Sequence, residues 1–378
     1  MTERKTVPSD IKIQNRQMVY NYIRRKGAAS KQDVVVDLQL SLPTVTQNLK
    51  YLQKKGLVDI SHQIENTGGR NAAAYAYMKE AKAGIGVYVT AHHINVVAVD
   101  MSGNVICKGR ERIKFNLNDE NYLKRIAFNV EQVRKDAHLT AEQIIGVGIA
   151  VPGLVSRNND RVIYGVSLGF TGVTSKKIEE FIPYPVELYH DSYVAGYAEV
   201  WREQGIKNAF YLNLNHSVGG AIVIDREIYN GDNNNGGDIC HMTMIDQGGE
   251  RCYCGKYGCM DTLCNAGFLD RHTDGNLDDF FTLLEQGDAQ IAKVWDTYLN
   301  QLSLVVNNIR MLFDSVIIIG GYVGEYLEDY MDELRKRVDR RNTFGDRAKT
   351  YLITSQYKGD ATAVGSGILM IEAFMEQI

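Results

Sequence analysis

Apolar positions near the start of the chain recur at helical spacing. Met18, Tyr22 and Ile23 share one face of a segment that ends in basic residues and Gly27, which are typical of a helix C-terminus. A second helix is expected to begin after Ser30, because a serine followed three residues later by an acid forms a capping box. The spacing therefore predicts two helices in close succession.

A third helix and a hairpin follow. Ser41 is the expected N-cap of this helix, whose apolar positions fall at i, i+4 and i+7. These positions are Val45, Leu49 and Leu52. Short strands at 57–60 and 74–77 complete the order helix, helix, helix, hairpin, which is typical of a winged helix-turn-helix. We predict such a domain over residues 1–80, and a three-helix protein-interaction module is the alternative.

From Gly84 onward, short apolar runs predict strands separated by helical segments. The expected strands lie at 84–89, 94–100, 105–107, 144–150, 209–214, 221–224 and 316–321, with a helix at about 119–137. The same order of elements occurs in both halves of this region. Two α/β halves predict a body of two lobes over residues 81–378, with a ligand cleft between the lobes.

The charge of the chain is divided between these two parts. The net charge of the 378 residues is −4, but residues 1–80 carry +6 and the remainder carries −10. A basic head on an acidic body indicates that the head alone meets a polyanion.

The outward face of the third helix is the predicted DNA-reading surface. Its polar residues are Thr44, Gln47, Asn48 and Lys50. Such side chains can pair with base edges or with phosphates. Arg70 follows two glycines at the hairpin tip, where a guanidinium can enter a narrow minor groove. The expected partner is double-stranded operator DNA, bound by two heads related by two-fold symmetry.

The six cysteines are distributed unevenly. Cys107 and Cys240 stand apart, whereas the other four lie between positions 252 and 264. The sequence shows no secretory signal and no apolar run of about 18–20 residues. We therefore expect a cytoplasmic protein whose clustered thiols bind a metal or stay reduced, rather than form disulfides.

Three motifs of the body resemble the ROK family of repressors, open reading frames and sugar kinases. Residues 147–155 read Val-Gly-Ile-Ala-Val-Pro-Gly-Leu-Val, residues 237–241 are similar to Gly-Glu-x-Gly-His, and residues 252–259 match Cys-x-Cys-Gly-x-x-Gly-Cys. The resemblance covers about residues 84–378. It implies an actin-like, ribonuclease-H-like sugar-kinase fold of two α/β lobes. A winged head in front of this fold is the arrangement of the family's xylose and N-acetylglucosamine repressors.

The cysteine motif is also chemically suited to zinc. Cys252 and Cys254 are close enough in sequence to share one ion, and the glycines that follow let the chain bring Cys259 back to it. His241 supplies a nitrogen, which completes a closed site for structural Zn²⁺. Cys264 is not a ligand in the family pattern. Reduced thiols without a metal are the alternative.

A sugar kinase of this fold needs two glycine-rich loops that admit the phosphates of ATP. The first reads Asp-x-Gly-Gly-Thr in the family's kinases, but residues 88–92 of this chain are Tyr-Val-Thr-Ala-His. The second reads Gly-Thr-Gly-x-Gly in the kinases and Asn-His-Ser-Val-Gly at 215–219 here. Because side chains occupy the space that the phosphates require, we expect no enzyme activity.

The sugar-binding positions implied by the family are better retained. Asp191 stands where the kinases carry the catalytic base, and without ATP its carboxylate can still accept hydrogen bonds from sugar hydroxyls. The other expected sugar-binding residues are Ser167, His190, Asp238, His241 and Asp261. Clustered acceptors suit a polyol. Because His190 replaces Asn and two of the acids replace Glu, these positions do not identify the sugar.

The sequence leaves three functions open. We favour a sugar-responsive, DNA-binding transcriptional repressor of carbohydrate-metabolism genes. It would be a homodimer or homotetramer in which a small sugar in the cleft changes operator affinity. The alternative is an ATP-dependent carbohydrate kinase with an appended DNA-binding head, and the third is a constitutive DNA-binding protein with a vestigial body. The two altered phosphate loops favour the repressor.

Overall fold

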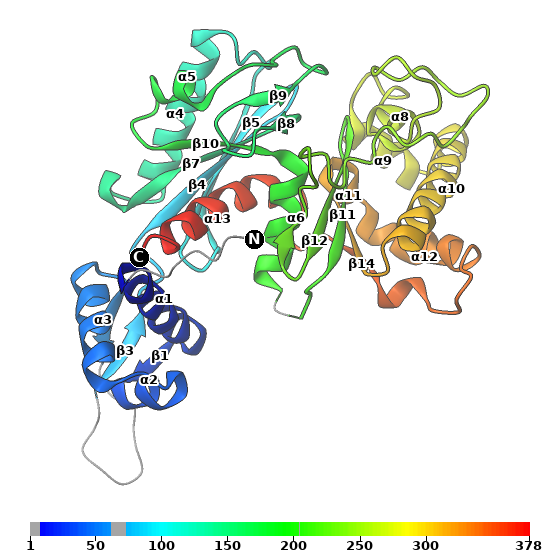
Figure 1. The fold of residues 1–378 in the computed structure, drawn as a ribbon. Helices are drawn as coiled ribbons and strands as arrows, with labels where there is room; N and C mark the ends of the chain where they lie inside the picture. Colours follow the sequence, from blue (N-terminus) through cyan, green and yellow to red (C-terminus); the bar gives the residue numbers. More distant parts are fainter. Residues whose placement is uncertain (1–7, 62–72, 204) are drawn as a thin grey trace.

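The structure is a computed structural model that describes residues 8–61, 73–203 and 205–378. Figure 1 shows a small head attached to a body of two lobes, with helices α6 (Asp191–Arg202) and α13 (Ala361–Met375) between the lobes. The C-terminus lies beside the head. Within the described ranges, no helix is both long enough and apolar enough to cross a membrane.

The described part of the head contains three helices and a small antiparallel sheet in the order β1-β3-β2. Its elements are α1 (Pro8–Lys26), β1 (Ala28–Ser30), α2 (Lys31–Leu38), α3 (Leu42–Lys54), β2 (Val58–Ser61) and β3 (Ala74–Tyr77). The predicted capping box is present, because Ser30 Oγ accepts from the Asp33 amide at 3.2 Å and Asp33 Oδ2 accepts from the Ser30 amide at 2.9 Å. Ser41 caps α3 in the same way through the Thr44 amide at 3.3 Å. These caps fix where α2 and α3 begin.

The buried face of α1 agrees with the predicted one at Tyr22 and Ile23 but not at Met18. Met18 is 43% exposed, whereas its neighbours Val19 and Tyr20 are buried. Met18 instead borders a cavity between the head and the body, together with Trp201 and Met375. The sequence spacing alone could not distinguish this side of α1 from the one that faces α2 and α3.

The first lobe is built on a mixed sheet in the order β10-β7-β4-β5-β6. Its elements are β4 (Ala83–Val89), β5 (His93–Asp100), β6 (Val105–Arg112), α4 (Glu120–Asp136), η1 (Ala141–Gln143), β7 (Ile144–Val151), β8 (Leu154–Val155), β9 (Val162–Tyr164), α5 (Ser175–Glu179) and β10 (Val186–His190). Figure 1 shows α4 and α5 on one face of the sheet and α13 on the other. Strand β7 is parallel to β4 and to β10, so the carboxyl ends of these strands meet at one edge.

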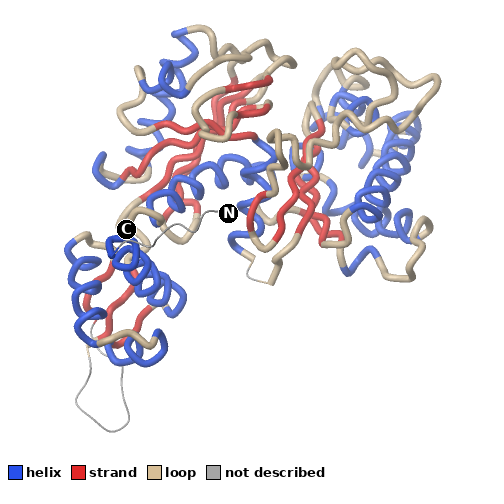
Figure 2. The backbone as a smooth tube through the Cα atoms, in the orientation of Figure 1, coloured by secondary structure: helices blue, strands red, loops and turns tan. Residues whose placement is uncertain are grey.

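The second lobe has a sheet in the order β13-β12-β11-β14-β15. Its elements are β11 (Ala209–Leu214), β12 (Val218–Ile224), β13 (Glu227–Ile228), α7 (Asp261–Cys264), α8 (Gly267–Asp270), α9 (Leu277–Glu285), α10 (Ala289–Leu312), β14 (Val316–Gly320), α11 (Gly321–Gly324), η2 (Leu327–Tyr330), α12 (Met331–Asp339), η3 (Ala348–Thr350), β15 (Leu352–Thr354) and η4 (Lys358–Asp360). Figure 2 shows the two sheets as separate layers and a loop-rich upper part of this lobe. The irregular segment between β13 and α7 carries the cysteine motif.

Close packing joins α13 to β4 and to α6. A side chain at Gly86 would place its Cβ 1.7 Å from the carbonyl oxygen of Ala363. One at Gly365 would place its Cβ 1.9 Å from the carbonyl oxygen of Val194. Both positions therefore need glycine, and the backbone of α13 lies directly against a strand of the first lobe and the helix that leads to the second.

The C-terminal end of α13 contacts the head. Gln17 Nε2 donates to the Glu376 carbonyl oxygen at 2.8 Å, and Arg24 Nη1 lies 3.8 Å from Glu372 Oε1. The Arg24 guanidinium also lies over the Trp201 ring of α6, 5.3 Å from its centroid. A single helix therefore connects the region between the lobes to the head.

Candidate functional site

A cavity lies between the lobes, where β7 and β10 end and β12 begins. Five of the six predicted sugar-binding residues line it, and these are Ser167, His190, Asp191, Asp238 and His241. The volume is about 50 Å³, well below the roughly 300 Å³ of the smallest usual ligand pockets. Ligand entry therefore requires the lobes or the lining side chains to move apart.

Asp191 begins α6 at the end of β10 and is buried. Its Oδ1 accepts from the Ser192 amide at 2.6 Å and from Ser192 Oγ at 3.1 Å, and its Oδ2 accepts from the Tyr88 hydroxyl at 3.3 Å. Burial raises the pKa of Asp191, while neighbouring His190 and these hydrogen bonds oppose the shift. A carboxylate has about four acceptor positions, and the three hydrogen bonds above use three of them. One acceptor position on Oδ2 therefore remains for a ligand hydroxyl.

His190 has an unused ring nitrogen. Its side chain is 9% exposed and packs edge-on against Tyr193, with 4.4 Å between ring centroids. Its Nδ1 has no hydrogen-bond partner among the described residues. Because leaving a buried polar atom unpaired is costly, this nitrogen is suited to pair with a ligand group.

The sixth predicted sugar-binding residue, Asp261, is not among the residues that line the cavity in this structure. Its side chain is buried at the start of α7, and its Oδ1 accepts from the Val218 amide at 2.8 Å and from Ser217 Oγ at 3.1 Å. These donors belong to the turn before β12, which does line the cavity. Asp261 therefore positions Ser217 at the cavity wall, and direct contact between Asp261 and a sugar stays a prediction.

The four predicted metal ligands come together on the second lobe. One donor atom from each of His241, Cys252, Cys254 and Cys259 lies within 4.8 Å of the others. Cys252 Sγ is 3.6 Å from His241 Nδ1, and the Sγ atoms of Cys254 and Cys259 are 3.7 Å apart. Tetrahedral zinc at its usual bond lengths separates a sulfur–nitrogen pair by about 3.5 Å and a sulfur–sulfur pair by about 3.8 Å. The donor set therefore fits such an ion.

This metal-ligand group borders the cavity. His241 belongs to both. Tyr253, between two of the cysteines, packs edge-on against the His241 ring at 5.0 Å, and its hydroxyl lies 3.4 Å from Ser217 Oγ. A metal at the group would therefore fix one wall of the cavity.

These motifs agree with the comparison of the whole sequence with protein families. The sequence profile of the ROK family matches residues 84–373. The chain belongs to the ROK family.

Among ROK proteins, a putative xylose repressor of Caldicellulosiruptor sp. (strain Rt8B.4) is 24% identical, and the match covers 96% of each chain. A glucokinase of Halalkalibacterium halodurans is 27% identical, over 64% of this chain and 80% of the kinase. The crystal structure of a ROK family transcriptional regulator, a homologue of the E. coli MLC protein, matches with a TM-score of 0.75 and 21% identity over 97% of each chain. The predicted two-lobed ROK fold is confirmed.

In this ROK protein, the Tyr88 hydroxyl takes part in two hydrogen bonds. Besides donating to Asp191, the Tyr88 hydroxyl accepts from Asn215 Nδ2 at 3.1 Å. Asn215 Oδ1 in turn accepts from the Tyr322 amide at 2.7 Å. Because Tyr88 belongs to the first lobe and the other two residues to the second, the hydrogen bonds bridge the lobes. The sequence shows the replacement at position 88 but not this bridge, whose two ends are 127 residues apart.

Helix α3 presents part of the predicted DNA-reading surface. Gln47 and Lys50 are exposed, and Thr44 is half-buried. The prediction that Asn48 faces outward is wrong, because its side chain is 3% exposed. It follows Val45 by three positions and therefore shares the buried face of the helix. Arg70 lies outside the described residues.

Proposed function

We propose that this chain is a sugar-responsive, DNA-binding transcriptional repressor of carbohydrate-metabolism genes. Residues 1–80 are a winged helix-turn-helix head, and residues 81–378 are the sugar-binding and dimerisation body. The observation that carries the proposal is the similarity to a xylose repressor over 96% of both chains, since this match includes the head that precedes the family profile at residue 84.

The head is proposed to bind double-stranded operator DNA through α3. Gln47 and Lys50 are free to reach base edges and phosphates, respectively. Figure 1 shows α3 on the side of the head away from the second lobe, so the body does not cover it. One head of this size has few contacts, and a homodimer or homotetramer with paired heads would provide the rest.

The four metal ligands are proposed to hold one structural Zn²⁺. The ion would supply no chemistry to a reaction. It would close the irregular segment between β13 and α7, and so keep His241 and Tyr253 in place beside the cavity.

The signal from the cavity to the head is proposed to pass through α6 and α13. Asp191 is the first residue of α6, and α13 packs against α6 at Gly365. The far end of α13 carries Glu372, which faces Arg24 of the head. A ligand that favours one arrangement of the lobes would thereby favour one position of the head.

A sugar kinase is the second candidate, because Asp191 is retained and a glucokinase is 27% identical. Against it, both glycine-rich phosphate loops of the family's kinases are altered at residues 88–92 and 215–219, and the Tyr88 and Asn215 side chains of these two segments hydrogen-bond to each other. A coupled assay with ATP over common hexoses and pentoses tests this. Turnover that disappears in Asp191→Asn would establish a kinase.

The experiment that tests the repressor is a search for a specific DNA site, followed by titration with sugars that stabilise the protein in a thermal-shift screen. Asp191→Ala should leave DNA affinity unchanged and abolish the response to the sugar. Asp136→Ala, which changes an exposed acid at the end of α4, is the matched control and should respond normally. If the wild-type protein selects no specific site, the proposal fails.

A further inference from the structure

The residues that line the cavity between the lobes are of two chemical kinds, and their exposure separates an inner group from an outer one. The inner part is polar and contains His190 and Asp191. The outer part contains Tyr164, Val166 and Tyr253, which are 40%, 55% and 44% exposed. We propose that this outer part is a second sugar-binding subsite, and that the effector is an uncharged glycoside of two rings, such as a disaccharide. The inference rests on the proposed function as a sugar-responsive regulator.

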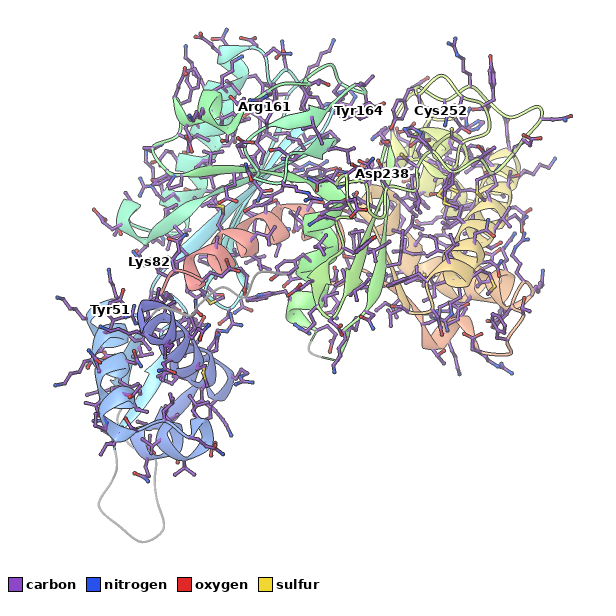
Figure 3. The ribbon with its side chains drawn as sticks, in the orientation of Figure 1. Tyr51, Lys82, Arg161, Tyr164, Asp238 and Cys252 are labelled. Carbon is purple, nitrogen blue, oxygen red and sulfur yellow. The ribbon has the colours of Figure 1, made fainter. Side chains whose placement is uncertain are left out.

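The outer part has walls from both lobes. Tyr164 ends β9 of the first lobe, and Tyr253 lies in the cysteine motif of the second. Figure 3 shows Tyr164 at the edge of the first lobe that faces the loop carrying Cys252, with Asp238 between the lobes. Aromatic faces pack against the apolar CH faces of sugar rings, and exposed aromatic side chains at a cavity mouth lose water when a ring covers them.

One of these walls is held in place before any ligand binds. The Tyr253 ring packs against His241, and its hydroxyl lies 3.4 Å from Ser217 Oγ. A side chain that is already ordered loses little conformational freedom when a ligand contacts it. Tyr253 is therefore a preorganised surface rather than a mobile exposed residue.

The charges around the cavity define the class of ligand. Among the described residues that line it, none is Lys or Arg, whereas Asp191 and Asp238 are both present. A sugar phosphate or sugar acid would bring a negative charge to these carboxylates without a cation to pair with it. The free Nδ1 of His190 and the open position on Asp191 suit the hydroxyls of a neutral inner ring.

The test uses the full-length protein and isothermal titration calorimetry. The probes are glucose, xylose, maltose, cellobiose, xylobiose and glucose 6-phosphate. We expect one disaccharide to bind at least about tenfold more tightly than its component monosaccharide, because the second ring buries further apolar surface. Tyr164→Ala should remove most of this preference for the disaccharide over the monosaccharide, and it should leave the affinity for the monosaccharide unchanged.

Tyr257→Ala is the matched control, because Tyr257 is 59% exposed on the same loop as Tyr253 but does not line the cavity. It should keep the full preference for the disaccharide. Equal affinities for mono- and disaccharides, an equal loss of both in Tyr164→Ala, or tighter binding of glucose 6-phosphate than of glucose would each overturn the inference and leave the proposed function standing. If none of the probes binds, both the inference and the sugar-responsive function fail.

Discussion

Arg24 offers a direct test of how the head is joined to the body. Its Nη1 lies 3.8 Å from Glu372 Oε1, with the two side chains 24% and 28% exposed. Its guanidinium lies over the Trp201 ring at 5.3 Å, and Trp201 Nε1 donates to the same glutamate. Side chains from α1, α6 and α13 therefore meet at one point, and Arg24 is the contribution of the head.

The loss of Arg24 should weaken the contact by about 1–1.5 kcal/mol. A partly exposed ion pair is worth about 0.5 kcal/mol, because water and salt screen it. A partly exposed cation–π contact is worth about 0.5–1 kcal/mol. Together they correspond to about a five- to tenfold change in the equilibrium between a docked and a free head.

The assay measures operator affinity with and without a saturating sugar. Arg24→Ala should reduce the ratio of these two affinities by up to about five- to tenfold, because the body can no longer hold the head in its docked position. Arg25→Ala is the matched control, because it removes the same charge from the same turn of α1. Among the described hydrogen bonds, the Arg25 side chain donates only to the Asn21 carbonyl oxygen of its own helix. Both variants lose one charge that DNA phosphates would attract. The same sugar response in both would refute the reasoning.

Three further predictions concern the metal, the bridge between the lobes and the DNA. Cys254→Ser should lower the zinc content from one ion per chain to none and lower the melting temperature, by about 2–4 °C for each kcal/mol lost; Cys107→Ser should change neither, and elemental analysis with calorimetry would check both. Tyr88→Phe should cost about 1–3 kcal/mol in urea unfolding, because buried Asp191 and half-buried Asn215 each lose a hydrogen bond; an unchanged midpoint would contradict the bridge. Lys50→Ala should lower the salt dependence of DNA binding by about one in logarithmic slope, whereas Gln47→Ala should cost about 1–3 kcal/mol on the specific site and little on random DNA.

Features that depend on a few neighbouring residues could be predicted from the sequence. The capping box at Ser30 is one, because its serine and acid lie three positions apart. The metal-ligand group is another, because three of its cysteines and the turns between them lie within residues 252–259. The altered phosphate loop at residues 88–92 was visible for the same reason.

Features that depend on distant segments could not be predicted in this way. Asp261 Oδ1 accepts from the Val218 amide, 43 positions away. The contact of Gln17 with Glu376 joins residues 359 positions apart. No local spacing carries information about such neighbours. The error at Asn48 is of another kind, because its spacing of three from Val45 already places it on the buried face of α3.

The bridge between the lobes offers the proposed regulator a route for signalling. A ligand hydroxyl that takes the remaining acceptor position of Asp191 Oδ2 would share this oxygen with the Tyr88 hydroxyl, which donates to it at 3.3 Å. The same hydroxyl accepts from Asn215 of the other lobe at 3.1 Å, so a change in one hydrogen bond alters the other. A sugar bound at Asp191, as proposed, would be coupled to the arrangement of the lobes through this hydroxyl, and each would influence the other by the same free energy. The Tyr88 hydroxyl thereby links the cavity to the start of α6.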